Sequence, residues 1–110
     1  MDDKSSLCFI HLKGEYHSSD VDRIKSHFEP AKKANVVVIN LRDVTCFDIS
    51  CFFELFNLRD ALVRRGGTVR IVMNKDYIKR LFMIGESDGD FEFFETLDAA
   101  MEFKTAAGAE

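Results

Sequence analysis

Three side chains that could take part in chemistry, those of Asp48, Ser50 and Cys51, lie within the tetrad Asp48-Ile49-Ser50-Cys51. A carboxylate can act as an acid, a base or a metal ligand, and a hydroxyl or thiol can act as a nucleophile. Apolar residues at helical spacing follow this tetrad, so we expect it to form the mouth of a helix. Free backbone N–H groups and the positive end of the helix dipole gather there. We therefore look for function at this helix mouth, where a thiol pKa is expected to fall.

The acidic, histidine and cysteine side chains give little support for catalysis. Asp48 directly precedes the expected helix, and its predicted role is that of an N-cap, ahead of metal binding or acid–base work. None of the histidines has a serine or cysteine at motif spacing: His11, His17 and His27. The cysteines lack CxxC spacing, and we predict free thiols that pack as small apolar residues: Cys8, Cys46 and Cys51. A small enzyme using Cys51 or Ser50 as nucleophile stays an alternative, although no base is visible for it.

Length and composition indicate one compact domain. The chain has 110 residues, of which 46% are hydrophobic and 31% are charged, as in an ordinary globular protein. The net charge of −4 and the scattered Lys and Arg residues argue against nucleic-acid binding. No apolar run approaches the ~20 residues of a membrane span, and the N-terminus has no secretory signal. We expect a cytoplasmic protein without direct membrane insertion, and no phosphate-binding glycine motif predicts a nucleotide or other cofactor.

Strand and helix patterns alternate along the chain. Continuous apolar and β-branched runs predict strands over residues 7–12, 36–41, 68–73 and 91–94, with a bend over 42–47. Helical spacing of apolar residues predicts helices that begin near residue 21, after the tetrad, over 75–84 and from 97. The 7–12 strand has the composition of one buried on both faces. The alternation predicts an α/β fold with a four- to five-stranded, mostly parallel sheet packed by about four helices.

The residues around the tetrad resemble the signature of the sulfate transporter and anti-sigma factor antagonist domain, abbreviated STAS. The pattern is an ordered set of short motifs: Asn40-Leu41, Asp43-Val44-Thr45-x-x-Asp48, the Ser-containing turn and Arg64-Arg65-Gly66-Gly67. It continues in Leu12-x-Gly14-Glu15-Tyr16, Lys79-Arg80-Leu81-Phe82-x-x-Gly85 and Thr96-Leu97-x-Ala99-Ala100-Met101. The resemblance implies one STAS-like domain over residues 7–104, with a short lead at 1–6 and a frayed tail at 105–110.

In stand-alone members of this family the tetrad is Asp-Ser-Ser-Gly. A partner kinase, itself the anti-sigma factor, phosphorylates the first Ser; the unphosphorylated antagonist binds that factor, and a phosphatase of the PP2C type resets the switch. By this resemblance Asp48 matches the Asp, Ile49 the phospho-acceptor, Ser50 the second Ser and Cys51 the Gly. Isoleucine cannot carry a phosphate. The resemblance therefore implies docking without the usual phosphorylation, with Ser50 as the one nearby site.

The resemblance also implies a bacterial signalling protein that regulates transcription by binding and is not an enzyme. Its expected partner is an anti-sigma factor or a related kinase-fold protein. The expected binding surface comprises four tetrad residues and one aromatic residue: Asp48, Ile49, Ser50, Cys51 and Phe53. Phe53 stands where many relatives have a small residue, and the sequence leaves open whether it is exposed or buried. The alternative is a scaffold subunit of a stress-signalling complex or an ABC transporter assembly.

Only six residues precede Leu7, where relatives have an additional edge strand. We therefore expect that edge strand to be short or absent. An uncovered edge offers a place for pairing with another chain, as in a weak homodimer.

Overall fold

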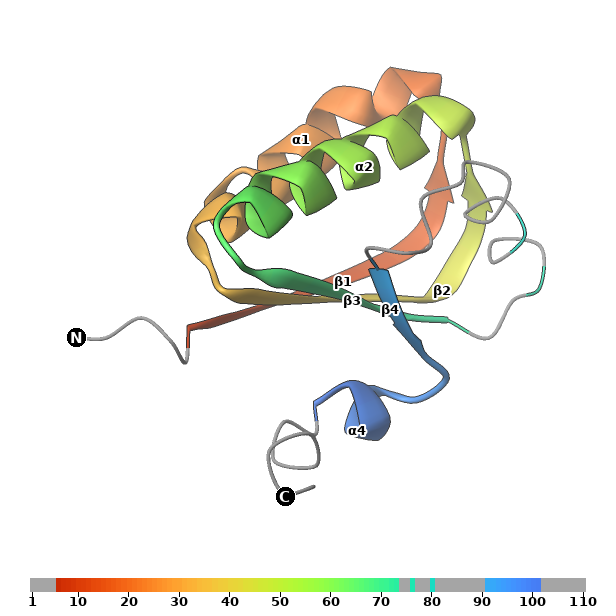
Figure 1. Cartoon of the computed structure of the whole chain (residues 1–110). Helices are drawn as coiled ribbons and strands as arrows, with labels where there is room; N and C mark the ends of the chain where they lie inside the picture. Colours follow the sequence, from red (N-terminus) through yellow and green to blue (C-terminus); the bar gives the residue numbers. More distant parts are fainter. Residues whose placement is uncertain (1–5, 74–75, 77–79, 81–90, 102–110) are drawn as a thin grey trace.

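The computed structural model describes residues 6–73, 76, 80 and 91–101. The described part contains one sheet of four strands in the order β1-β2-β3-β4 (Figure 1). All neighbouring strands are parallel. Their bounds are β1 Leu7–Tyr16, β2 Val36–Phe47, β3 Thr68–Val72 and β4 Phe91–Phe94. The predicted α/β class with a parallel sheet is confirmed.

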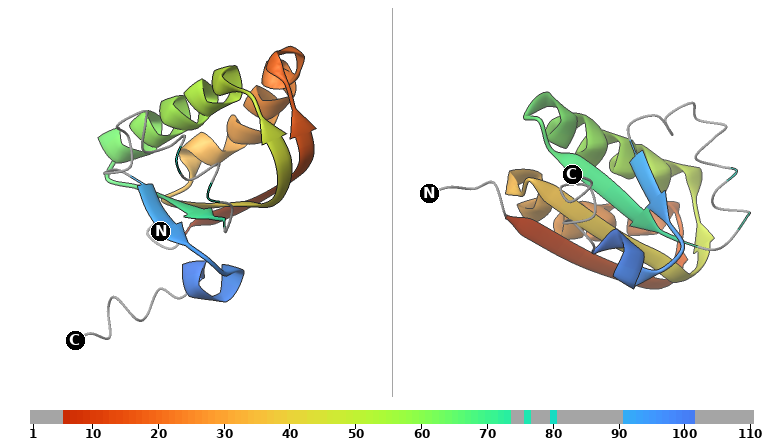
Figure 2. Two further views of the ribbon diagram at one scale, coloured as in Figure 1. Left: turned by 90° about the vertical axis from the view of Figure 1, so that its right-hand side faces the viewer. Right: turned by 60° about the horizontal axis from the view of Figure 1, so that its bottom comes forward.

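Helices cover the two faces of the sheet unequally. Both long helices, α1 (Val21–Phe28) and α2 (Ile49–Arg64), lie on one face, and the short α4 (Leu97–Ala100) lies on the other (Figures 1 and 2). Two 3₁₀ turns, η2 (Ser18–Asp20) and η3 (Pro30–Lys33), flank α1. The helix expected over 75–84 and the tail expected from 105 lie outside the described residues, apart from two helical positions at 76 and 80. Most of the lead at 1–6 lies outside them as well.

The main core lies between α1, α2 and the sheet. Alternate residues of β2 point toward it and are fully buried, together with the inner side of α2: Val37, Ile39, Leu41, Leu55, Leu58 and Leu62. The intervening β2 residue Val38 is also fully buried, with Val72 of β3 and Ala100 of α4, in a smaller cluster on the opposite face. Burial on both faces confirms that β2 is a central strand.

Two strands are longer than the sequence predicts. β1 continues to Tyr16, and β2 continues through the expected bend to Phe47. The extensions pair with each other despite two shifts in register, between His11 and Lys13 and between Gly14 and Glu15. Each shift lets one strand carry an additional residue, so the polar sequence of the extension still forms a ladder. The prediction of a bend over 42–47 was wrong because it did not include this pairing.

The expected burial of the first strand on both faces was also wrong. Leu7 and Phe9 are 40% and 44% exposed, whereas Ile10 and Leu12 face the core. The physical reason is the position of β1 at the edge of the sheet, where α4 does not cover it.

The glycine pair after α2 ends the helix as predicted. Gly66 has a φ of 82°, in the region that favours glycine at a helix C-terminus. The next residue, Gly67, lies so close to the residue before β2 that an added Cβ would be 2.8 Å from the carbonyl oxygen of Asn35. This turn brings the chain directly from α2 into β3.

Candidate functional site at the N-terminus of α2

Asp48 is the N-cap of α2, as the sequence predicts. One of its carboxylate oxygens accepts two hydrogen bonds from Ser50, from the backbone N–H at 2.9 Å and from the hydroxyl at 2.5 Å. These bonds stabilise the ionised carboxylate and hold the pKa of Asp48 below its usual range. The mouth of the helix therefore has a negatively charged, well-anchored cap.

Backbone and aromatic contacts attach this cap to the rest of the domain. The N–H of Asp48 donates to the carbonyl of Tyr16 at the end of β1, over 2.9 Å. Below it, the ring of Phe47 packs edge-on against Tyr16 and Phe52, with centroid distances of 5.9 and 4.9 Å. The first turn of α2 thus packs against a buried aromatic cluster, which holds this turn in one conformation.

Cys51 does not have the properties of a nucleophile. Its side chain is fully buried, and its thiol donates to the carbonyl oxygen of His17 at 3.6 Å. Burial raises the pKa of Cys51, and the nearby carboxylates of Asp48 and Asp20 raise it further. Cys51 therefore packs as a small apolar residue, as predicted, and the lowered thiol pKa on which the enzyme alternative relies is not found, because the side chain points into the core. The same geometry weighs against Cys51 as the nucleophile of an enzyme.

Ile49 and Phe53 form an exposed apolar pair beside the cap. They are 56% and 55% exposed, so the structure resolves the open question about Phe53 in favour of exposure. Residues four apart lie on the same side of a helix, and these two share the side of α2 that points away from the sheet. The ring of Phe53 also lies 6.2 Å from that of the half-buried Phe56. We call Ile49 and Phe53, with the accessible edge of Phe56, the Ile49–Phe53 patch.

The structure thus brings four of the five predicted site residues together near the surface and places Cys51 below them. Sequence reasoning missed Tyr16 and His17, whose backbone carbonyls bind the start of α2. The Gly14-Glu15-Tyr16 motif was the available signal, but nothing in the sequence showed that the end of β1 meets the tetrad.

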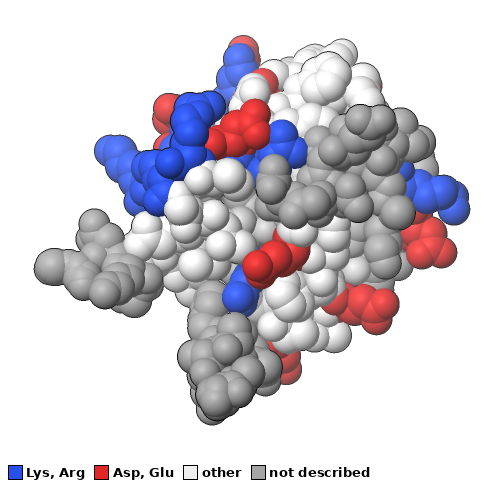
Figure 3. Space-filling view, in the orientation of Figure 1, with Lys and Arg blue, Asp and Glu red and all other residues white. Residues whose placement is uncertain are grey.

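Charges divide between the two ends of α2. Near the mouth, His17 pairs with Glu15 at 2.9 Å, and the N–H of His17 donates to Asp20 at 2.8 Å. That bond, with the neighbouring Arg23, lowers the pKa of Asp20. Lys and Arg gather over η3 and the C-terminal end of α2 (Figure 3), where the chain has Lys32, Lys33, Arg64 and Arg65. The patch therefore lies at the end of α2 that is remote from this basic cluster.

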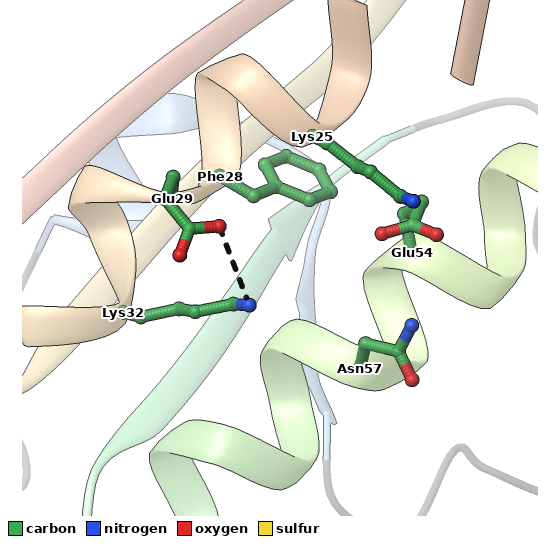
Figure 4. A pocket seen from close by; sticks show the side chains of 6 residues that line it. All are labelled: Lys25, Phe28, Glu29, Lys32, Glu54 and Asn57. Carbon is green, nitrogen blue, oxygen red and sulfur yellow. Dashed lines mark ion pairs between the residues drawn. The ribbon is translucent and has the colours of Figure 1, made fainter. Parts of the chain in front are cut away.

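A groove of about 330 Å³ separates α1 from α2. Its lining alternates in charge around the buried ring of Phe28: Lys25, Glu29, Lys32, Glu54 and Asn57 (Figure 4). Glu29 and Lys32 form an ion pair at 3.5 Å, and Lys25 extends toward Glu54. Two basic and two acidic side chains offset one another, so the lining of the groove carries no formal net charge. In the described part of the chain, no three His, Cys, Asp or Glu side chains gather closely enough to hold a metal ion.

Comparison with known proteins identifies the family. The profile of the STAS domain matches residues 1–100. The chain belongs to the STAS domain family. No curated protein matches the sequence. None of the described helices of this STAS domain is long and apolar enough to cross a membrane.

Several solved structures share the fold at low sequence identity. The anti-sigma factor antagonist SpoIIAA in its unphosphorylated form has a TM-score of 0.70 and 14% identity, over 86% of this chain and 84% of that one. The Bacillus cell fate determinant SpoIIAA in the phosphorylated form has a TM-score of 0.70 and 15% identity, over 87% and 88%. A sulfate transporter family protein from Wolinella succinogenes has a TM-score of 0.70 and 14% identity, over 94% and 88%.

Proposed function

We propose that this STAS domain is a bacterial, cytoplasmic regulator of the anti-sigma factor antagonist type, which acts by binding and not by catalysis. Its partner is an anti-sigma factor or a related kinase-fold protein, and it docks through the mouth of α2. The observation that carries this proposal is the exposure of Ile49 and Phe53 beside a firmly anchored cap. Similarity in fold to SpoIIAA, described as an anti-sigma factor antagonist, supports it.

The energetics of the patch fit docking. Burial of an exposed aliphatic or aromatic side chain contributes about 1.5–3 kcal/mol, and each 1.4 kcal/mol changes a dissociation constant about tenfold. Ile49 and Phe53 are more than half exposed, so a partner that covers both gains much of this energy. Large exposed apolar side chains that adjoin one another are typical of protein-binding surfaces.

The proposed protein differs from the family pattern in how docking is regulated, because the usual phosphorylation is absent. Ile49 stands at the position of the usual phospho-acceptor, and the hydroxyl of Ser50 is donated to Asp48. Docking is then constitutive, and a PP2C-type phosphatase acts on this protein only if Ser50 becomes modified. No cofactor or nucleic acid takes part.

A capture experiment with matched baits tests the proposal. Wild-type protein, Ile49→Asp and Val63→Asp are each immobilised and exposed to lysate of the native cell, followed by mass spectrometry. Val63 is a suitable control because it is an exposed apolar residue of the same helix, about 21 Å farther along its axis. We expect a kinase-fold protein on the wild-type and Val63→Asp baits and its loss from Ile49→Asp. Equal capture by all three baits would contradict docking at the mouth of α2.

A second candidate is a STAS subunit of a membrane transport assembly. The specific observation in its favour is the shared fold with a sulfate transporter family protein, over most of both chains. Capture from detergent-solubilised membranes distinguishes the two: co-purification with a transporter or its ATPase favours this second function.

A further inference from the structure

Within the described part of the chain, one edge of the sheet is open along β1. β1 pairs with β2 and with no other strand among the described residues, and it runs along the outside of the sheet (Figure 2). Over Leu7–His11 its register with β2 is regular, and the segment contains no proline, Lys, Arg, Asp or Glu. The one titratable side chain of the segment with an ion-pair partner, His11, is paired with Asp43 at 2.8 Å. An open and regular strand edge is a template for pairing with another strand.

Features that block edge pairing occur only in the second half of β1. Both register shifts lie beyond His11, with the additional residue in β2, and Lys13 and Glu15 place charges in this half of β1. The N–H of Lys13 already donates to the hydroxyl of Tyr16 at 3.3 Å. Charges and irregular pairing protect an edge strand, and an occupied donor is not available to a new partner. The first half of β1 has none of them.

The pairing with β2 fixes which backbone groups point outward. The carbonyl of Ser6 accepts from the N–H of Val36 at 3.2 Å, so Ser6 is directed toward β2. Successive residues of a strand direct their N–H and C=O groups to opposite edges. The backbone groups of Leu7, Phe9 and His11 are therefore directed to the open edge. The side chains of Leu7 and Phe9 are also exposed, on the face opposite α1 and α2.

We propose that two copies of this chain pair through β1, antiparallel, about a two-fold axis at Phe9. In this register Phe9 lies opposite Phe9 of the second copy, and Leu7 lies opposite its His11. The N–H and C=O groups of Leu7, Phe9 and His11 then pair with the outward N–H and C=O groups of the second copy, as in the hydrogen-bonded pairs of an antiparallel ladder.

The second copy is favoured as occupant because the segment is self-complementary. The two-fold brings no like charges together, and the cross-strand aromatic pair stabilises the contact. In the same register the side chains of Leu7 and Phe9 gain cross-strand neighbours on one face, and the sheet continues across the dimer. One short strand from each copy makes a small interface, so the dimer is weak and concentration-dependent.

Sedimentation and amide exchange test this dimer. We expect wild-type protein to dimerise as its concentration rises from micromolar to millimolar. Phe9→Lys should weaken the dimer at least tenfold, because it places two ammonium groups opposite each other. Val63→Lys, an exposed substitution away from β1, should leave it unchanged.

Amide exchange tests the register. Protection of the Leu7, Phe9 and His11 amides should increase with protein concentration, whereas Cys8 and Ile10, directed toward β2, stay protected throughout. A protein that remains monomeric at millimolar concentration, or a dimer that Phe9→Lys leaves intact, would overturn the proposal. Concentration-independent exchange at Phe9 would do the same.

Discussion

Ser50 donates both its backbone N–H and its hydroxyl to a single carboxylate oxygen of Asp48, over 2.9 and 2.5 Å. These two hydrogen bonds hold the first turn of α2 in place, and one of them uses the only hydroxyl of the tetrad. A phosphate on Ser50 would replace this donor by an anion beside a carboxylate, which repels it. The cap that stabilises the helix therefore also disfavours modification of the site.

The first prediction concerns phosphorylation. After incubation with the kinase-fold partner and ATP, we expect the wild-type protein to carry no stoichiometric phosphate, measured by intact-protein mass spectrometry. Ile49→Ser restores an exposed hydroxyl at the family's acceptor position and should gain a phosphate on that residue. Stoichiometric modification of Ser50 in the wild-type protein would contradict the account.

The second prediction concerns the pH dependence of stability. Asp48 has a pKa below its unfolded value of about 3.9, so its contribution is complete above that value and disappears as pH falls toward the folded pKa. Asn is also a good N-cap but does not titrate. Urea unfolding measures the free energy of unfolding of both proteins. The difference between wild type and Asp48→Asn should be constant from pH 7 to 5, and below about pH 4 the wild type should lose stability relative to Asp48→Asn. A difference that is the same at pH 6 and pH 3 would rule out the depressed pKa.

The third prediction concerns the thiols. Cys51 is fully buried with a raised pKa, whereas Cys46 is partly accessible. In native protein at pH 7 a thiol reagent should modify Cys51 more slowly than Cys46, and both quickly after unfolding in urea. Peptide mapping of the labelled protein measures this. Rapid labelling of Cys51 in the folded state would revive the nucleophile alternative.

The fourth prediction compares two adjacent aromatic residues. Phe52 is 1% exposed and packs against Phe47, whereas Phe53 is 55% exposed. Phe52→Ala should lower the free energy of unfolding by about 3–5 kcal/mol, a large share of the stability of a domain of this size. Phe53→Ala should change it by no more than about 0.5 kcal/mol. Equal losses in urea unfolding would show that Phe53 belongs to the core.

The sequence predicted the elements whose signals are local. The N-cap at Asp48 and the glycine stop at Gly66 follow from side-chain chemistry within a few residues, and both are confirmed. The central position of β2 followed from its continuous β-branched run. Helical spacing of the apolar residues also predicted burial on one side of α2, where Leu55 and Leu62 are fully buried; Val63, an apolar residue next to Leu62, is 43% exposed.

Features that depend on distant parts of the chain could not be predicted. The extensions of β1 and β2 exist because they pair with each other across two register shifts. Leu7 and Phe9 are exposed because β1 is an edge strand, which the composition of the strand does not reveal. The raised pKa of Cys51 depends on its orientation into the core, below a cap held by Tyr16.

The central claim is that partners dock on the Ile49–Phe53 patch, and calorimetric titration of the captured partner with three proteins tests it most directly. Ile49→Asp should keep the wild-type stability within about 0.5 kcal/mol, since Ile49 is mostly exposed. Its affinity should fall at least tenfold, or about 1.4 kcal/mol, because a carboxylate resists desolvation in an interface. Val63→Asp should bind as the wild type does. Unchanged affinity of a folded Ile49→Asp protein would contradict the claim.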